Sequence, residues 1–123
     1  MATNLFPTKI KIGHYTYAVK EFPKGYTTDY GACVYAHQTI FLNRNQTAQQ
    51  AAETLLHEIM HAIWFVASVD FIPDLHEEII IRTEATWLMS VLDNNKELMK
   101  FLMNPAKTWI PRFEKDALDG MTK

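Results

Sequence analysis

The chain has 123 residues, of which 48% are hydrophobic and 21% are charged, and its formal net charge is −2. Such a length and composition are typical of one soluble domain with its own core. The small negative charge, with basic residues scattered along the chain, gives no reason to expect nucleic acid or a membrane surface as partner. The longest apolar run, residues 62–69, is too short for a membrane-spanning helix.

The first third of the chain predicts strands. Polar and apolar residues alternate over Lys9–Ile12, and Tyr15–Val19 is rich in aromatic and β-branched residues, with a turn between the two segments. A second pair, Gly31–Tyr35 and Thr39–Leu42, has the same character. Two successive hairpins predict a small antiparallel sheet.

Helices are expected in the rest of the chain. Thr47 is suited to a helix N-cap, with a glutamine three residues later as in a capping box, and nothing breaks a helix from Ala48 to about Ala67. After a break at Asp70–Asp74, a second helix is expected from about Leu75 to Leu92 and a short third helix over Glu97–Met103.

A sheet followed by helices predicts an α+β domain, with the second helix antiparallel to the first. We divide this single domain into a β-sheet part (1–46), a helical metal-binding part (47–104) and an irregular tail (105–123). The residues from Glu114 onward are expected to be loosely held.

The motif His57-Glu58-Ile59-Met60-His61 lies inside the first predicted helix. Residues four apart share one face of a helix, so His57 and His61 can bind the same zinc ion. Glu58 lies about 100° further round the helix, where it can act as general base on a water that zinc activates. The pattern is rare by chance in a chain of this length, and it predicts a minimal zincin-like domain.

Two histidines leave a zinc site incomplete. Trp64 and Ala67 stand where the metzincin pattern has its glycine and its third histidine, which argues against that class. The second helix offers Glu77, Glu78 and Glu84 instead. Each has an ordinary alternative as a helix cap, a surface carboxylate or a buried polar residue, and physical reasoning does not separate the three.

The stretch from Thr54 to Trp64 resembles a group of small bacteriophage and prophage zinc metallopeptidases related to the gluzincins. Further likeness lies in the acidic pair Glu77-Glu78 and in the run from Leu88 to Leu98, although Lys96 stands where proline is common. The resemblance covers most of the chain, from the first hairpin to about Phe101.

The register of this run implies Glu78 as the third ligand of one Zn²⁺ ion, beside His57 and His61, with Glu77 as the second choice and Glu84 as the third, and with Glu58 as the catalytic base. The resemblance also implies peptide-bond hydrolysis, and an edge strand, either Gln38–Leu42 or Gly31–Tyr35, that pairs with a peptide or protein substrate. It implies no particular substrate. The alternative is a phage-encoded regulatory or interaction protein with a structural zinc ion and no protease activity.

Cys33 is the only cysteine, so the chain can form no internal disulfide, which suits a reducing bacterial cytoplasm. We expect Cys33 in the core. His14 and His37 are expected at hairpin turns. His76, Tyr35 and Arg82 are candidate partners of the transition state. Trp64, Phe65 and Trp87 are expected in the core or at an interface.

Overall fold

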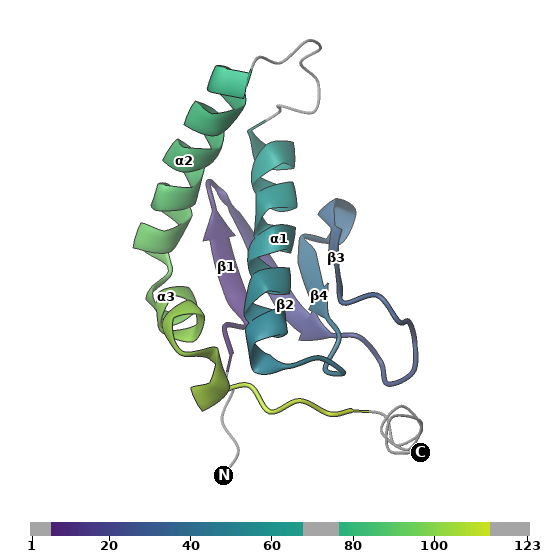
Figure 1. The fold of residues 1–123 in the computed structure, drawn as a ribbon. Coiled ribbons are helices and arrows are strands. Elements are labelled where there is room, and N and C mark those ends of the chain that lie inside the picture. The colour runs from purple at the N-terminus through teal and green to yellow at the C-terminus, as the bar shows by residue number, and fades with distance from the viewer. Residues whose placement is uncertain (1–5, 68–76, 114–123) are drawn as a thin grey trace.

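The computed structural model describes residues 6–67 and 77–113, apart from the side chains of residues 77–79 and 81 (Figure 1). Its strands are β1 (Lys9–Ile12), β2 (Tyr15–Glu21), β3 (Gly31–Val34) and β4 (Thr39–Leu42). Its helices are α1 (Ala48–Val66), α2 (Glu77–Asn94) and α3 (Lys96–Met103), with short 3₁₀ turns at Tyr35–His37 and Pro105–Lys107. The α+β class is confirmed.

The sheet is mixed, so the expectation of a purely antiparallel sheet is wrong. Its order is β1-β2-β4-β3, with β1 antiparallel to β2 and β3 antiparallel to β4. The central pair β2 and β4 is parallel, from Ala18 beside Thr39 to Glu21 beside Leu42. The chain after β2 skips one strand position to form β3, and β4 then fills the gap. Strand patterns alone do not show which strands become neighbours.

This topology makes β3 an edge strand and places β4 inside the sheet. The loop that leads into β3 is fixed by the side-chain amide of Asn43, which donates to the carbonyls of Thr27 at 3.0 Å and Asp29 at 2.9 Å. Of the two segments considered for strand addition, only Gly31–Val34 lies at an edge of the sheet that the described residues form.

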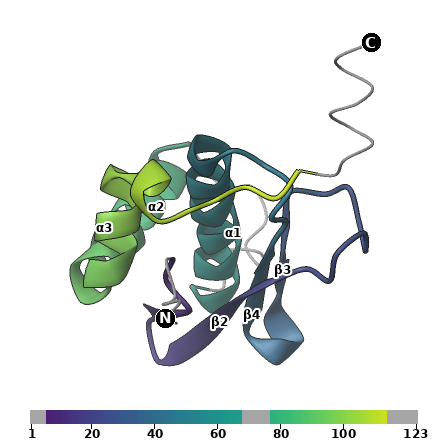
Figure 2. The same ribbon diagram turned by 90° about the horizontal axis from the view of Figure 1, so that it is seen from below.

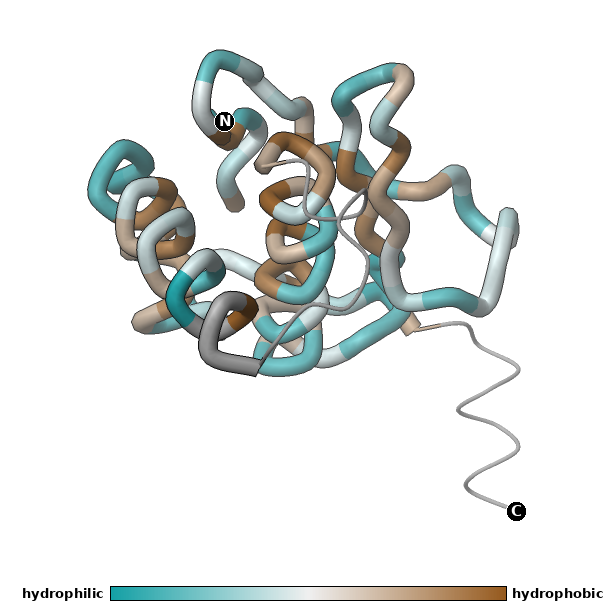
Figure 3. Tube along the Cα trace, turned by 90° about the horizontal axis from the view of Figure 1, so that it is seen from above, coloured by the Kyte–Doolittle hydropathy of each residue, from teal (hydrophilic) through white to brown (hydrophobic). Residues whose placement is uncertain are grey.

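Helix α1 packs against one face of the sheet and contributes six of the sixteen buried hydrophobic residues in the described part (Figure 2). Hydrophobic residues recur along this central helix in Figure 3 because a 3.6-residue period brings them to the face that meets the strands. The Thr47 hydroxyl accepts a hydrogen bond from the backbone N–H of Gln50 at 3.1 Å, which confirms the expected N-cap. The completely buried core residues include Ile10, Ile12, Ile40, Leu42, Leu55, Ile59 and Ile63.

Helices α2 and α3 and the segment after them complete the core beside α1. Helix α2 packs beside α1 and over β1, and Asn95 fastens its end by two hydrogen bonds to the backbone of Lys11, at 2.9 and 3.0 Å. Trp109 is 2% exposed and its indole N–H donates to the carbonyl of Gln46 at 3.0 Å. The core thus extends past α3 into the segment expected to be irregular.

Three expectations fall on residues that the structure does not describe: the break at Asp70–Asp74, the position of His76 and the tail from Glu114. No helix among the described residues is both long enough and apolar enough to cross a membrane.

Candidate metal centre

His57 and His61 lie one turn apart near the middle of α1, and both are exposed. Their Nε2 atoms face each other at 3.2 Å, with ring centroids 4.8 Å apart. Two Zn–N bonds of about 2.05 Å that meet at the tetrahedral angle place their nitrogens about 3.3 Å apart. The pair therefore already has the separation that a tetrahedral zinc ion requires.

Glu58 points in a different direction from the two histidines, toward the sheet. Only 8% of its surface is exposed, and its carboxylate forms no ion pair with a described lysine or arginine. Burial raises the pKa of Glu58, and the neighbouring His57 and His61 lower it in part. A buried carboxylate with a raised pKa, next to a histidine pair, is a suitable proton acceptor.

Gly31, the first residue of β3, gives Glu58 its room. A Cβ atom at this position would lie 2.6 Å from Cγ2 of Thr54, 3.0 Å from the carbonyl oxygen of Phe41 and 3.3 Å from Cγ of Glu58. The backbone of β3 can therefore approach α1 closely only because residue 31 has no side chain. In the sequence, Gly31 stands out only as the first residue of a predicted strand. A glycine opening a strand pattern, which often marks a close backbone approach, was the available signal.

We expect Gly31→Ala to destabilise the fold by about 1–3 kcal/mol, because the added methyl group forces α1 and β3 apart. Urea unfolding of the two proteins measures the difference. Adding Thr54→Ser removes the nearest methyl group but keeps the hydroxyl that donates to Oε1 of Gln46 at 2.9 Å, so this second change should restore part of the loss. Equal stability of Gly31→Ala and the parent would contradict the close packing.

Two pockets flank His57. One, the β3 pocket, has a volume of about 490 Å³ and is lined by residues 28–31 and by Gln50, Glu53, Thr54, His57 and Glu58. The other, the α2 pocket, has a volume of about 380 Å³ and is lined by His57, Met60, His61, Trp64 and Glu84. His57 belongs to both pockets, so the histidine pair and Glu58 lie at the junction of two cavities.

Of the three glutamates considered as third ligand, Glu84 lines the α2 pocket with both histidines. Its Oε1 atom accepts a hydrogen bond from the indole N–H of Trp64 at 2.8 Å. Glu77 and Glu78 form the first turn of α2, and their side chains lie outside the described part. Within that part, no group of three or more His, Cys, Asp or Glu side chains is arranged to hold a metal ion.

Cys33 is partly buried on β3 and packs against the core. Burial, with the nearby charge of Glu58, raises the pKa of its thiol to about 12. The thiol therefore stays protonated near neutral pH and is a poor nucleophile. The ring of Tyr35 stacks on Phe65 at a centroid distance of 4.4 Å, just beyond the end of β3. His14, His37 and Arg82 are exposed.

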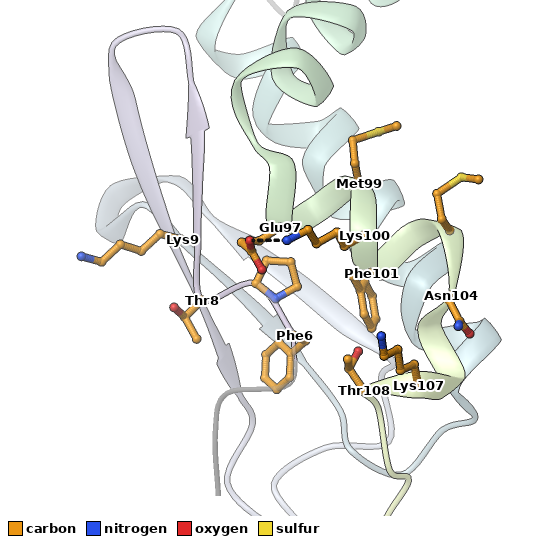
Figure 4. A pocket seen from close by; sticks show the side chains of 12 residues that line it. Phe6, Thr8, Lys9, Glu97, Met99, Lys100, Phe101, Asn104, Lys107 and Thr108 are labelled. Atoms are coloured by element: carbon orange, nitrogen blue, oxygen red, sulfur yellow. Dashed lines mark hydrogen bonds and ion pairs between the residues drawn. The ribbon is translucent and has the colours of Figure 1, made fainter.

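A larger pocket of about 730 Å³ lies away from the histidines, between the start of β1, α3 and the Pro105–Lys107 turn (Figure 4). Its lining contains no histidine. Glu97, the one carboxylate in that lining, forms an ion pair with Lys100 at 3.4 Å. The larger cavity therefore differs from the two pockets beside His57, because it contains neither the histidine pair nor Glu58.

The family model Peptidase_M78, described as the IrrE N-terminal-like domain, matches residues 11–108. The matched range begins in β1, includes the whole of α1 with its histidine pair, and ends after the Pro105–Lys107 turn. Searches of curated proteins and of solved structures each give no match.

Proposed function

This chain belongs to the Peptidase_M78 family of IrrE N-terminal-like domains, and on that premise we propose that it is a metallopeptidase that hydrolyses peptide bonds with one Zn²⁺ ion. The observation that carries the proposal is the 3.2 Å separation of the Nε2 atoms of His57 and His61, with Glu58 buried beside them. A zinc ion with three protein ligands and one open position is the usual catalytic arrangement.

In this proposal the side chains of His57 and His61 bind the ion as neutral imidazoles. When bound, zinc would polarise a water molecule and the carbonyl group of the scissile bond. Glu58 would take the proton from the attacking water and later deliver it to the leaving amine. Burial moves the pKa of Glu58 from its ordinary value toward neutral pH, which suits a group that must both accept and donate a proton.

We propose that the third ligand comes from α2. The family resemblance implies Glu78, whose side chain lies outside the described part, whereas Glu84 lines the α2 pocket with both histidines. Glu84 and the two histidines do not form a metal-binding group in the structure, so as a ligand Glu84 would have to move toward them. Glu78 lies six residues before Glu84 in α2, which is about 9 Å along the helix axis. Because α2 is antiparallel to α1 (Figure 1), this places Glu78 farther from His61 than Glu84 is. The Trp64 hydrogen bond would orient one oxygen of Glu84 and leave the other available to the ion. We therefore favour Glu84 over Glu78, and Glu78 over Glu77.

We further propose that the substrate is an extended peptide or an unfolded segment of a protein that adds to the free edge of β3. Strand addition at this edge would bring the peptide backbone past Gly31, which lies directly over Glu58. The bacteriophage origin and the cytoplasmic location stay predictions from the sequence.

The test is the cleavage of a mixed pool of peptides by protein purified without added metal, with the products identified by mass spectrometry. We expect close to one equivalent of zinc per chain, cleavage of some peptides, loss of cleavage with a chelator and recovery on adding zinc. Bound zinc without cleavage of any peptide would instead indicate the regulatory protein with a structural zinc ion. Absence of zinc, with no rise in thermal stability on adding it, would refute the metal site itself.

A further inference from the structure

The β3 pocket is acidic on a molecule of nearly balanced charge. Three carboxylates line it, from Asp29, Glu53 and Glu58, and no lysine or arginine does. The ion pairs between described residues use the carboxylates of Glu21 and Glu97 and leave these three without a basic partner. A pocket of about 490 Å³ lined by three carboxylates and one histidine, and by no lysine or arginine, is an environment that favours a cation.

The carboxylates are distributed over both walls and the inner end of the pocket. Glu53 lies four residues before His57, so the two side chains share one face of α1. Asp29 lies on the opposite wall, where its backbone N–H donates to the Thr27 hydroxyl at 3.1 Å and its carbonyl accepts from Asn43 at 2.9 Å. Glu58 is at the inner end, 8% exposed and without a hydrogen-bond partner among the described residues.

We infer that the β3 pocket binds the basic side chain, lysine or arginine, of a peptide lying along β3, and that Asp29 and Glu53 determine this preference. The inference rests on the proposed function, because it places the basic residue next to the bond that is cleaved at His57 and Glu58. It adds a substrate class, basic peptides, and two specificity residues that do not take part in the hydrolytic step.

Charge and side-chain length both favour a lysine or arginine side chain in this pocket. A lysine or arginine side chain has a long apolar stem, which can lie along the pocket while its charged end remains near the partly hydrated carboxylates at the mouth. A glutamate in the same place would be repelled, and a leucine would desolvate the carboxylates without pairing them. The α2 pocket on the other side of His57 contains Met60 and Trp64 instead. The two sides of the candidate site therefore differ in the side chains that they accept.

A binding experiment tests the inference separately from catalysis. Zinc-loaded Glu58→Gln protein is titrated with two ten-residue peptides whose ends are blocked and whose sequences differ only at the central residue. This residue is lysine in one peptide and norleucine, an uncharged analogue of lysine, in the other. We expect the lysine peptide to bind about three- to tenfold more tightly, as two partly exposed ion pairs allow. Adding Asp29→Asn and Glu53→Gln should remove the difference, whereas the control changes Asp93→Asn and Glu97→Gln, on exposed residues outside the pocket, should keep it.

The preference should also weaken as the salt concentration rises, because exposed charges are screened. Equal affinity for the two peptides, or a lysine preference that survives the double change at Asp29 and Glu53, would overturn the inference. The cleavage assay separates the two proposals. Cleavage with no preference for basic residues refutes the acidic subsite alone, whereas a lysine preference in binding without any cleavage refutes the hydrolytic function and retains the subsite.

Discussion

Replacing Glu58 with glutamine is expected to lower kcat/KM for peptide hydrolysis by about 10²–10⁴-fold and to leave zinc bound. Glutamine keeps the shape of the side chain but cannot accept the proton of the attacking water. Because Glu58 faces β3 rather than the gap between the histidine nitrogens, the change should not disturb the metal ligands. Peptide cleavage rates and zinc content, measured on the same preparation, test both parts.

The same change should stabilise the metal-free protein near neutral pH. Burial raises the pKa of Glu58 above its ordinary value of 4.5, so the folded state binds this proton more tightly than the unfolded state does. The ionised carboxylate therefore costs stability above the folded-state pKa, and the cost disappears as the pH falls below 4.5. Thermal unfolding with a chelator should show a gain for Glu58→Gln at pH 7 that shrinks toward pH 4.

A matched control is Glu97→Gln, which removes an exposed carboxylate on α3 whose partner is Lys100. Such surface pairs contribute about 0–1 kcal/mol, so neither the cleavage rate nor the stability should change appreciably. If Glu58→Gln kept the parent rate of cleavage while Glu97→Gln behaved as expected, Glu58 would have no part in proton transfer and another base would have to be sought.

Removal of either proposed histidine ligand is expected to lower zinc affinity strongly. His57→Ala or His61→Ala should lower zinc affinity by more than the 10–100-fold that loss of a ligand's hydrogen-bond partner typically costs. It should also abolish the rise in thermal stability that zinc gives the parent protein. Competition with a chromogenic chelator measures the affinity. His37→Ala, at an exposed histidine in the turn between β3 and β4, should leave the affinity unchanged.

The choice among the three glutamates of α2 follows from the same measurement. We expect Glu84→Gln to weaken zinc binding strongly, and Glu77→Gln and Glu78→Gln to have little effect. Trp64→Phe removes the hydrogen bond to Glu84 but no ligand, so it should cost an intermediate amount, about 10–100-fold. If Glu78→Gln were the variant that lost zinc, the ligand implied by the family resemblance would be correct and Glu84 would serve only as the partner of Trp64.

The sequence predicted the helices well because their signals are local. The expected bounds of all three helices agree with α1, α2 and α3 to within two residues. The cap at Thr47, the apolar repeat and the spacing of the histidines each depend on residues within one or two turns. The 3.2 Å separation of the imidazole nitrogens follows from the same four-residue spacing, which makes the histidine pair the part of the candidate site most easily predicted from the sequence.

Long-range contacts were not readable in the same way. The strands themselves were recognised, but the parallel pairing of β2 with β4 depends on which strand position the chain skips. Trp109 is buried in the core and donates a hydrogen bond to Gln46, 63 residues earlier in the chain. No local sequence pattern predicts this contact. The acidic pocket likewise joins Asp29 to Glu53 across the gap between β3 and α1.

By itself, then, the sequence determined the helix that carries His57, Glu58 and His61, and the chemistry that these residues can perform together. Only the tertiary structure decided that β3 is an edge strand, that Gly31 lets it approach Glu58, and that Glu84 shares a pocket with the histidines. The physical reason is the range of the interactions. Helical periodicity fixes neighbours within a few residues, whereas packing between elements depends on the whole set of side chains that fill the core.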